Sequence, residues 1–227
     1  MHKMSAKKEH LFAFFDVDDT IISTKSMMGF IALYFTDINN ENLKNKFYTE
    51  VKELTNLGAS WETMNEVYYS YFKNFSTESV KKIANLWFFN NIEHPLGFYH
   101  KNIVKILKEH QSNGIECVFV SGSFQELLQP IADDLGVKHI LSINLERKEG
   151  KYTGNIIPPQ TIGTGKADAM RLFIEDKECL LSDCYAYGDD ISDVPMLSIV
   201  GNPVAVTGGR RLESYAKEHG WATTNPN

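Results

Sequence analysis

Short apolar runs that stop abruptly at clusters of polar residues are the strongest pattern along this chain. There are three of them: residues 11–15 before Asp16-Val-Asp-Asp-Thr20, residues 116–120 before Ser121-Gly-Ser123, and residues 184–187 before Gly188-Asp-Asp190. A run of this kind is typical of a strand that is buried on both faces of a parallel sheet. Weaker strand patterns lie at residues 139–143 and 203–206.

Helical patterns separate the predicted strands. They cover residues 98–111, 125–135 and 166–174. Strands that alternate with helices predict an α/β fold, in which a doubly wound, Rossmann-like parallel sheet is covered on both faces. Residues 146–157 predict an additional hairpin that turns at Glu149-Gly150.

Residues 26–94 interrupt this alternation. The segment is rich in helix-forming and aromatic residues, and Pro95 and Gly97 mark the return to the alternating pattern. We therefore predict a core domain of residues 1–25 and 95–227 and an inserted helical cap of residues 26–94. Most of the aromatic side chains of the insertion are expected to form its own core.

Composition restricts the classes of function. The chain has 227 residues, of which 43% are hydrophobic and 23% charged, and its net charge is −6, so it lacks the basic signature of a nucleic-acid-binding protein. Residues 1–10 contain no apolar signal core, and no apolar stretch is long enough to span a membrane. The three cysteines, Cys117, Cys179 and Cys184, indicate neither a disulfide framework nor a zinc site. These features predict a cytoplasmic protein of undetermined oligomeric state.

The polar clusters after the predicted strands carry the candidate chemistry. In an open parallel sheet, ligands bind beyond the carboxyl ends of the strands, so we expect Asp16, Asp18, Ser121, Asp189 and Asp193 to converge in one crevice. Four carboxylates in one crevice repel one another unless a divalent cation is present. A set of oxygen ligands favours Mg²⁺ over zinc.

Asp16 and Asp18 are spaced for phosphoryl transfer. A carboxylate can accept a phosphoryl group to form an aspartyl-phosphate, which water then cleaves. A second group must protonate the departing alcohol and afterwards activate the water. A hydroxyl from Thr20 or Ser121 and the ammonium of Lys166 can neutralise the phosphoryl oxygens.

Four ordered motifs carry a family resemblance. Asp16-Val-Asp-Asp-Thr20, Ser121-Gly-Ser-Phe124, Lys166 and Gly188-Asp-Asp-Ile-Ser-Asp193 resemble the motifs of the haloacid dehalogenase superfamily. The helical insertion after the first motif resembles the subgroup that contains phosphoserine phosphatase. The resemblance extends from residue 11 to about residue 206.

This resemblance implies a role for each motif residue. Asp16 would be the nucleophile and Asp18 the general acid and base. The phosphate would be held by Thr20, Ser121, Gly122 and Lys166. Magnesium would be bound by the Asp16 carboxylate, the Asp18 main-chain carbonyl and Asp189, with Asp193 acting through the metal's water shell.

The chain departs from the phosphoserine phosphatase pattern at three positions. Asp190 and Ser192 replace a glycine and an asparagine of the last motif, and the resemblance assigns them no role. Lys25 stands where the first motif of that enzyme continues to a glutamate that recognises the substrate amine. Lys25 is therefore a candidate substrate-binding residue, and its charge argues against phosphoserine as the substrate.

The function predicted by these residues is Mg²⁺-dependent hydrolysis of a small-molecule phosphomonoester through a phospho-aspartyl intermediate. A phosphotransferase, or a phosphonatase using Lys25 as a Schiff base, is the alternative within the same superfamily. A haloalkanoate dehalogenase is less favoured, because it needs neither the metal nor Asp18. From other classes come a receiver-like signalling protein and a phosphate-binding regulator without catalysis, and the intact Asp16–Asp18 pair argues against the latter.

Overall fold

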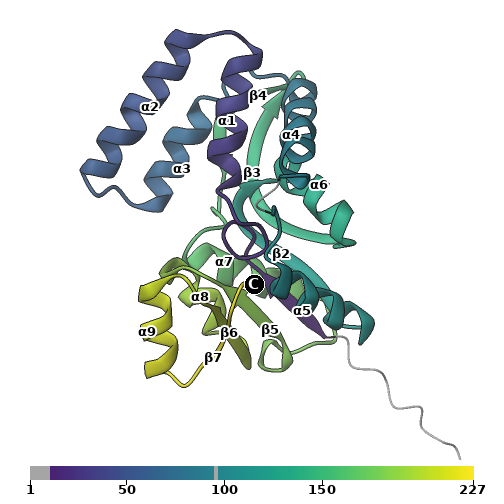
Figure 1. The fold of residues 1–227 in the computed structure, drawn as a ribbon. Helices are drawn as coiled ribbons and strands as arrows, with labels where there is room; N and C mark the ends of the chain where they lie inside the picture. The colour runs from purple at the N-terminus through teal and green to yellow at the C-terminus, as the bar shows by residue number, and fades with distance from the viewer. Residues whose placement is uncertain (1–10, 95–96) are drawn as a thin grey trace, which may run out of the picture.

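The computed structural model describes residues 11–94 and 97–227. Residues 1–10, for which the sequence predicts no apolar signal core, lie outside this range, and so does Pro95. A twisted sheet with flanking helices forms one part of the molecule, and four helices that follow the first strand form a second part above it (Figure 1).

The sheet has seven strands in the order β4-β3-β2-β1-β5-β6-β7, and only the β3–β4 pair is antiparallel. The strands are β1 (Phe12–Phe15), β2 (Glu116–Phe124), β3 (His139–Lys148), β4 (Lys151–Ile157), β5 (Tyr185–Gly188), β6 (Asn202–Val206) and β7 (Ala222–Thr224). Because β1 lies between β2 and β5, the residues that follow these three strands meet at one edge of the sheet. The predicted α/β, doubly wound parallel sheet is confirmed.

The first strand shows why its sequence is continuously apolar. Ala13 and Phe15 belong to the hydrophobic cluster on one face of the sheet, which also holds residues of α5 (Lys101–Ser112). Phe12 and Phe14 belong to the cluster on the other face. The second cluster is covered by α7 (Thr164–Ile174), α8 (Val194–Leu197) and α9 (Arg210–Glu218). Both faces of β1 are therefore buried.

The insertion folds into four helices, α1 (Ser26–Asp37), α2 (Glu41–Asn56), α3 (Trp61–Ser70) and α4 (Thr77–Ile92). Asn40, Ser60 and Ser76 cap the last three helices by accepting hydrogen bonds from backbone amides. Most of the aromatic side chains of the insertion are buried, although Trp61 and Phe89 are exposed. They do not form a core of their own as expected, because they belong to one hydrophobic cluster with residues of the sheet, such as Phe124.

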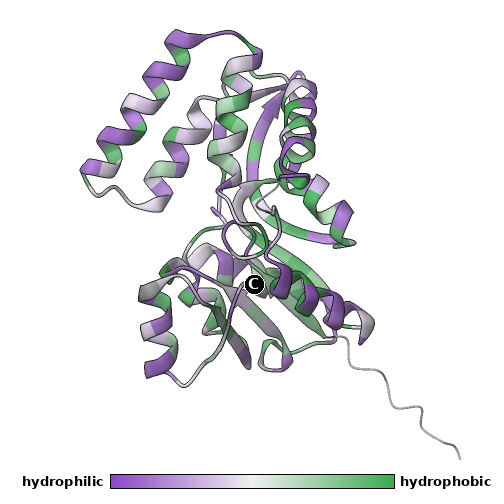
Figure 2. Cartoon of the chain, viewed as in Figure 1, coloured by the Kyte–Doolittle hydropathy of each residue, from purple (hydrophilic) through white to green (hydrophobic). Residues whose placement is uncertain are grey.

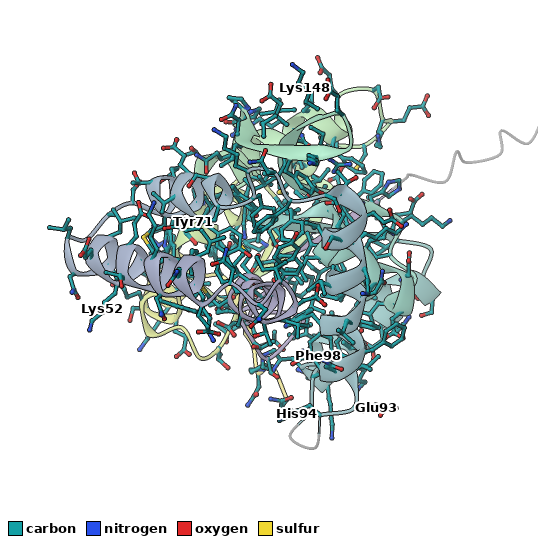
Figure 3. The ribbon with its side chains drawn as sticks, turned by 90° about the horizontal axis from the view of Figure 1, so that it is seen from above. Lys52, Tyr71, Glu93, His94, Phe98 and Lys148 are labelled. Atoms are coloured by element: carbon teal, nitrogen blue, oxygen red, sulfur yellow. The ribbon has the colours of Figure 1, made fainter. Side chains whose placement is uncertain are left out.

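The view from above places the labelled side chains relative to this core. Tyr71 and Phe98 lie over the interior of the molecule, whereas Lys52 and Lys148 lie at its periphery (Figure 3). Colouring by hydropathy gives the same division, because apolar residues follow the strands and the outer surfaces of the helices are polar (Figure 2).

The β3–β4 hairpin connects the insertion to the sheet. The hairpin rises beside α1 and α4 (Figure 1), and backbone hydrogen bonds join Asn74, Phe75 and Thr77 to Tyr152 and Gly150. Its turn lies at Glu149-Gly150 as predicted, and both residues have positive φ angles. The insertion is thus fixed at its far end as well as at its two chain connections.

Several element boundaries differ from the sequence predictions. Residues 139–148 form one continuous strand, whereas we expected a short strand followed by a separate hairpin. Helix α5 begins at Lys101 instead of residue 98, because Phe98 is buried in the core before the helix starts. Helix α6 (Gln125–Leu135) has its predicted bounds. Strand β7 was not predicted, since Ala222–Thr224 is short and mostly exposed.

Among residues 11–94 and 97–227, no helix combines the length and the apolar character that crossing a bilayer requires.

Candidate active site

The loop after β1 brings Asp16 and Asp18 to the edge of the sheet. The Asp16 amide donates to the Tyr187 carbonyl (2.9 Å), which extends the pairing of β1 with β5 by one residue. The chain then turns tightly, because the amides of Ile21 and Ile22 both donate to the Val17 carbonyl. This turn places Asp16 and Thr20 of the first motif, both of them buried, beyond the end of β1.

Lys166 lies at the centre of the site. It comes from the first turn of α7, its side chain is 5% exposed, and its Nζ lies 2.6 Å from Asp16 Oδ1 and 2.6 Å from Asp193 Oδ1. Burial alone would lower the pKa of Lys166, but the two carboxylates outweigh burial and raise the pKa above its ordinary value. Lys166 is therefore a fixed positive charge beside the Asp16 carboxylate.

Three carboxylates form a cluster with the geometry of a metal site. One oxygen each from Asp16, Asp189 and Asp193 lies within 4.8 Å of the others. A side chain at Gly188 would place its Cβ 2.6 Å from Asp193 Oδ2, so glycine is required for this close approach. Oxygen donors at these separations suit Mg²⁺ or another hard cation.

The electrostatics of the cluster also fit a cation. Burial, together with the charges of Asp16 and Asp193, raises the pKa of Asp189 to about 8. Burial likewise raises the pKa of Asp193 to about 6, against the opposing charge of Lys166. One lysine does not compensate three clustered carboxylates, and a divalent cation would remove the remaining repulsion.

Asp18 is partly buried and is held by one side chain. Its Oδ2 accepts a 3.0 Å hydrogen bond from the Ser26 hydroxyl, and its Oδ1 has no partner among the described residues. Burial, with a smaller contribution from Asp16, raises the pKa of Asp18 to about 7. A carboxyl group with this pKa can donate and accept a proton near neutral pH, as a general acid and base must.

The hydroxyl of Thr20 is used within the acidic cluster. Thr20 is buried, and its Oγ1 donates to Asp189 Oδ1 at 2.8 Å. In this structure the hydroxyl therefore orients a candidate metal ligand, and the expectation that Thr20 holds the phosphate stays a prediction.

Ser121 and Gly122 lie at the end of β2, beside the first motif. The Ser121 hydroxyl accepts from the Ser123 amide (3.1 Å), and the Gly122 carbonyl accepts from the Tyr69 hydroxyl (3.1 Å). Ser121 is buried, and Asn65 of α3 packs against Gly122. The second motif is therefore in direct contact with the insertion.

Lys25 lies at the outer edge of the site, where it precedes the first residue of α1. Its Nζ is 2.8 Å from Asp19 Oδ2, and its side chain is 57% exposed. Burial opposes the charge of Lys25, but the hydrogen bond and charge of Asp19 dominate and raise the pKa of Lys25. A Schiff-base lysine must be neutral to react, so this environment counts against the phosphonatase alternative.

Asp190 and Ser192, to which the resemblance assigned no role, support Asp193. The Asp190 side chain accepts from the Ser192 amide (2.9 Å), and the Asp190 amide donates to Asp193 Oδ2 (3.2 Å). These bonds form a capping box around the short helix 191–193. Asp190 and Ser192, which depart from the family pattern, therefore still help to hold Asp193 beside Lys166.

Sequence reasoning missed three residues at this site: Ser26, Asn65 and Tyr69. Each comes from the insertion, and each contacts a motif residue or its neighbour only because α1 and α3 pack over the edge of the sheet. No spacing along the chain signals these contacts.

Comparison with known proteins agrees with this geometry. The sequence model of the haloacid dehalogenase-like hydrolases matches residues 13–198. A probable phosphatase of Mycobacterium tuberculosis is 31% identical over 223 residues, which are 96% of this chain and 76% of that protein. A histidinol-phosphatase of Neisseria meningitidis is 26% identical over 226 residues, 94% of this chain and 97% of that protein. The resemblance indicated by the four motifs is thereby confirmed.

A solved structure shows that the fold is shared. A phosphoserine phosphatase, captured as an analogue of its phospho-aspartyl intermediate, superposes with a TM-score of 0.63 at 20% identity. The superposition covers 91% of each chain.

Proposed function

This chain belongs to the haloacid dehalogenase-like hydrolases and is a phosphatase, and we propose that it hydrolyses a small-molecule phosphomonoester through a phosphorylated Asp16. The observation that carries this proposal is that two neighbouring carboxyl groups of the loop after β1, Asp16 and Asp18, have unlike surroundings. Asp16 is fixed beside the ammonium of Lys166, whereas burial raises the pKa of Asp18 to about 7. The first arrangement suits a nucleophile and the second a proton carrier.

In the first half-reaction, an Asp16 carboxylate oxygen attacks the phosphorus and the bond to the alcohol breaks. Asp18 gives its proton to the departing oxygen. In the second half-reaction, Asp18 takes a proton from water, which attacks the phosphorus and releases inorganic phosphate. Asp16 is then a free carboxylate again.

The phosphoryl oxygens need positive partners throughout both steps. Lys166 supplies a full charge, and the Ser121 hydroxyl and the Gly122 amide extend the same pocket. Mg²⁺ held by Asp16, Asp189 and the Asp18 carbonyl, with Asp193 behind it, would add charge neutralisation at the phosphoryl group.

We propose that residues 26–94 act as a cap domain over a core of residues 1–25 and 95–227. Contacts of Ser26 with Asp18 and of Tyr69 with Gly122 support this division of labour, because they bring insertion residues against the reacting groups. Lys25, at the boundary, is proposed to act on substrate selectivity. A cytosolic location, inferred from cysteine usage, stays a prediction.

The deciding experiment is a phosphate-release screen over diverse phosphomonoesters, with Asp16→Asn as the control. The enzyme should release phosphate from several substrates, and the variant from none. Including acceptor alcohols in the screen separates a hydrolase from the alternative phosphotransferase, which would form new phosphate esters. Turnover by Asp16→Asn at the wild-type rate would reject the proposal.

A further inference from the structure

Helix α3 turns one polar face toward the second motif. Asn65 and Tyr69 are one turn apart on this face and are 6% and 0% exposed. Tyr69 donates to the Gly122 carbonyl, and the Asn65 Nδ2 would lie 3.7 Å from a Cβ placed on Gly122. The amide end of Asn65 therefore faces the side of Gly122 where a side chain would stand, in the segment that is proposed to hold the phosphate.

The Asn65 amide nitrogen is buried without a hydrogen-bond partner in the part of the chain that the structure describes. Leaving a buried polar group unpaired costs about 1–3 kcal/mol. The Gly122 carbonyl already accepts from Tyr69, and Gln160 Nε2 donates to Glu66, while Gln160 Oε1 is itself a buried acceptor without a partner among the described residues. A bound ligand that supplies an oxygen would give the Asn65 amide nitrogen its missing hydrogen-bond acceptor.

The position of Asn65 indicates which part of the ligand this oxygen belongs to. Asp16 approaches the phosphoryl group from the core, whereas Asn65 reaches the same loop from the insertion. In-line attack places the leaving group opposite the nucleophile, and hence on the side of α3.

The charges on α3 restrict the leaving group further. Glu62 and Glu66 lie on the same face as Asn65, where Gln160 contacts Glu66 and Glu62 Oε1 would lie 3.4 Å from a Cβ on Gly163. Two carboxylates at this edge disfavour an anionic leaving group, and the charge of Lys25 is already paired with Asp19.

We infer that Asn65 is a specificity residue that binds an uncharged oxygen, a hydroxyl or a carbonyl, on the leaving group of the substrate. This inference rests on the proposed function and adds the substrate class: phosphate esters of polyols or similar hydroxylated alcohols. The juxtaposition of Asn65 with Gly122 is the observation that supports it.

The test compares two substrates that differ only in hydroxyl groups, glycerol 3-phosphate and n-propyl phosphate. Wild type should have the larger kcat/KM for glycerol 3-phosphate. Asn65→Leu, of similar volume but without the amide, should reduce that ratio by about tenfold, the effect expected when one buried hydrogen bond is lost. The loss should fall mainly on KM, because the contact exists in the bound substrate as well as in the transition state.

Controls separate this contact from a structural effect. Asn45→Leu, an exposed position on α2, should leave the ratio unchanged. Asn65→Ser serves if Asn65→Leu does not fold, since it shortens the side chain but keeps a polar group. The inference is overturned if the folded Asn65 variant has an unchanged ratio. It is also overturned if the wild type prefers n-propyl phosphate, or if it rejects both esters while hydrolysing p-nitrophenyl phosphate. Absence of Asp16-dependent hydrolysis of every ester instead overturns the proposed function.

Discussion

The hydroxyl of Ser26, the first residue of α1, donates a 3.0 Å hydrogen bond to Asp18 Oδ2. Ser26 is 0% exposed, and Asp18 is partly buried. The bond leaves Asp18 Oδ1 as the buried oxygen without a partner among the described residues. Ser26 therefore fixes one of the two carboxyl oxygens, and it ties the start of the insertion to the proposed general acid.

Replacing Ser26 by alanine should slow the protonation of the leaving group. We expect kcat/KM for an alkyl phosphate, which reports the first half-reaction alone, to fall about tenfold, the value of one buried hydrogen bond to a charged group. The kcat/KM for p-nitrophenyl phosphate should fall much less, because nitrophenolate departs without a proton. Steady-state kinetics on both esters measure the difference. Equal losses on both substrates would mean that Ser26 does not act through Asp18, and Ser70→Ala, an exposed serine on α3, is the matched control.

Asp16→Asn should abolish turnover while the protein remains folded. The amide cannot accept a phosphoryl group, so kcat should fall by on the order of 10⁴-fold or more. Asp18→Asn should slow both half-reactions by on the order of 10²-fold or more, since each needs a proton transfer. Acid-quenched samples analysed by mass spectrometry should carry a phosphoryl adduct on Asp16 in the Asp18 variant and none in the Asp16 variant. An adduct on another residue would reassign the nucleophile.

Chelation should remove the activity, and Mg²⁺ should restore it. The Asp16, Asp189 and Asp193 cluster offers only oxygen donors, and Ca²⁺ should replace Mg²⁺ poorly because it prefers longer bonds and more ligands. The assay is phosphate release after EDTA treatment, followed by titration with each metal. Full activity after exhaustive chelation would reject the metal site and favour a metal-independent reaction.

The motif residues were predictable because a parallel sheet has a simple rule. Asp16 and Asp189 follow β1 and β5, and Ser121 lies in the last part of β2. The carboxyl ends of neighbouring parallel strands meet at one edge of the sheet, whatever the length of each strand. Errors in strand length therefore did not affect the predicted convergence. For that reason, failing to predict the continuous β3 and the short β7 had no consequence for the predicted site.

The contribution of the insertion was not predictable in the same way. Ser26, Asn65 and Tyr69 reach the site through the packing angles of α1 and α3, which depend on many aromatic contacts far apart in the sequence. Thr20 is a related case. The place of Thr20 in the motif suggests a phosphate contact. Nothing in the spacing of the motifs indicates that its hydroxyl donates to Asp189.

Buried His110 should make stability fall at mildly acidic pH. Its Nε2 lies 2.8 Å from the Tyr187 hydroxyl, the rings of Phe15 and Tyr185 pack beside it, and burial lowers its pKa against a smaller opposing effect of Glu109. The unfolded chain therefore binds a proton below about pH 6.5 that the folded protein resists, so the free energy of unfolding decreases as pH falls through that value.

Chemical denaturation at pH 7.5 and pH 5.5 measures this effect. His110→Gln keeps a hydrogen-bonding side chain but cannot be protonated, so its stability should lose about 1 kcal/mol less than the wild type between the two pH values. An identical pH dependence in both proteins would show that His110 titrates alike in the folded and unfolded states. Because both proteins retain the carboxylate cluster, its own pH dependence is common to the two measurements and cancels in the comparison.

Phosphoserine should be a poor substrate, and Lys25 should be one reason. Its ammonium lies at the edge of the site and would repel the ammonium of phosphoserine. The structure limits the size of this effect, because Lys25 is 57% exposed and its charge is partly balanced by Asp19. We therefore expect Lys25→Glu to raise kcat/KM for phosphoserine, relative to glycerol 3-phosphate, by about tenfold instead of the larger factor that a buried charge would give. The gain should shrink as ionic strength rises.

Lys105→Glu makes the same charge change on α5 at a side chain that is 72% exposed, and it should not alter the preference. If phosphoserine is the best substrate of the wild type, Lys25 does not repel the substrate amine; if Lys105→Glu produces the same gain, net charge and not the position of Lys25 sets the selectivity.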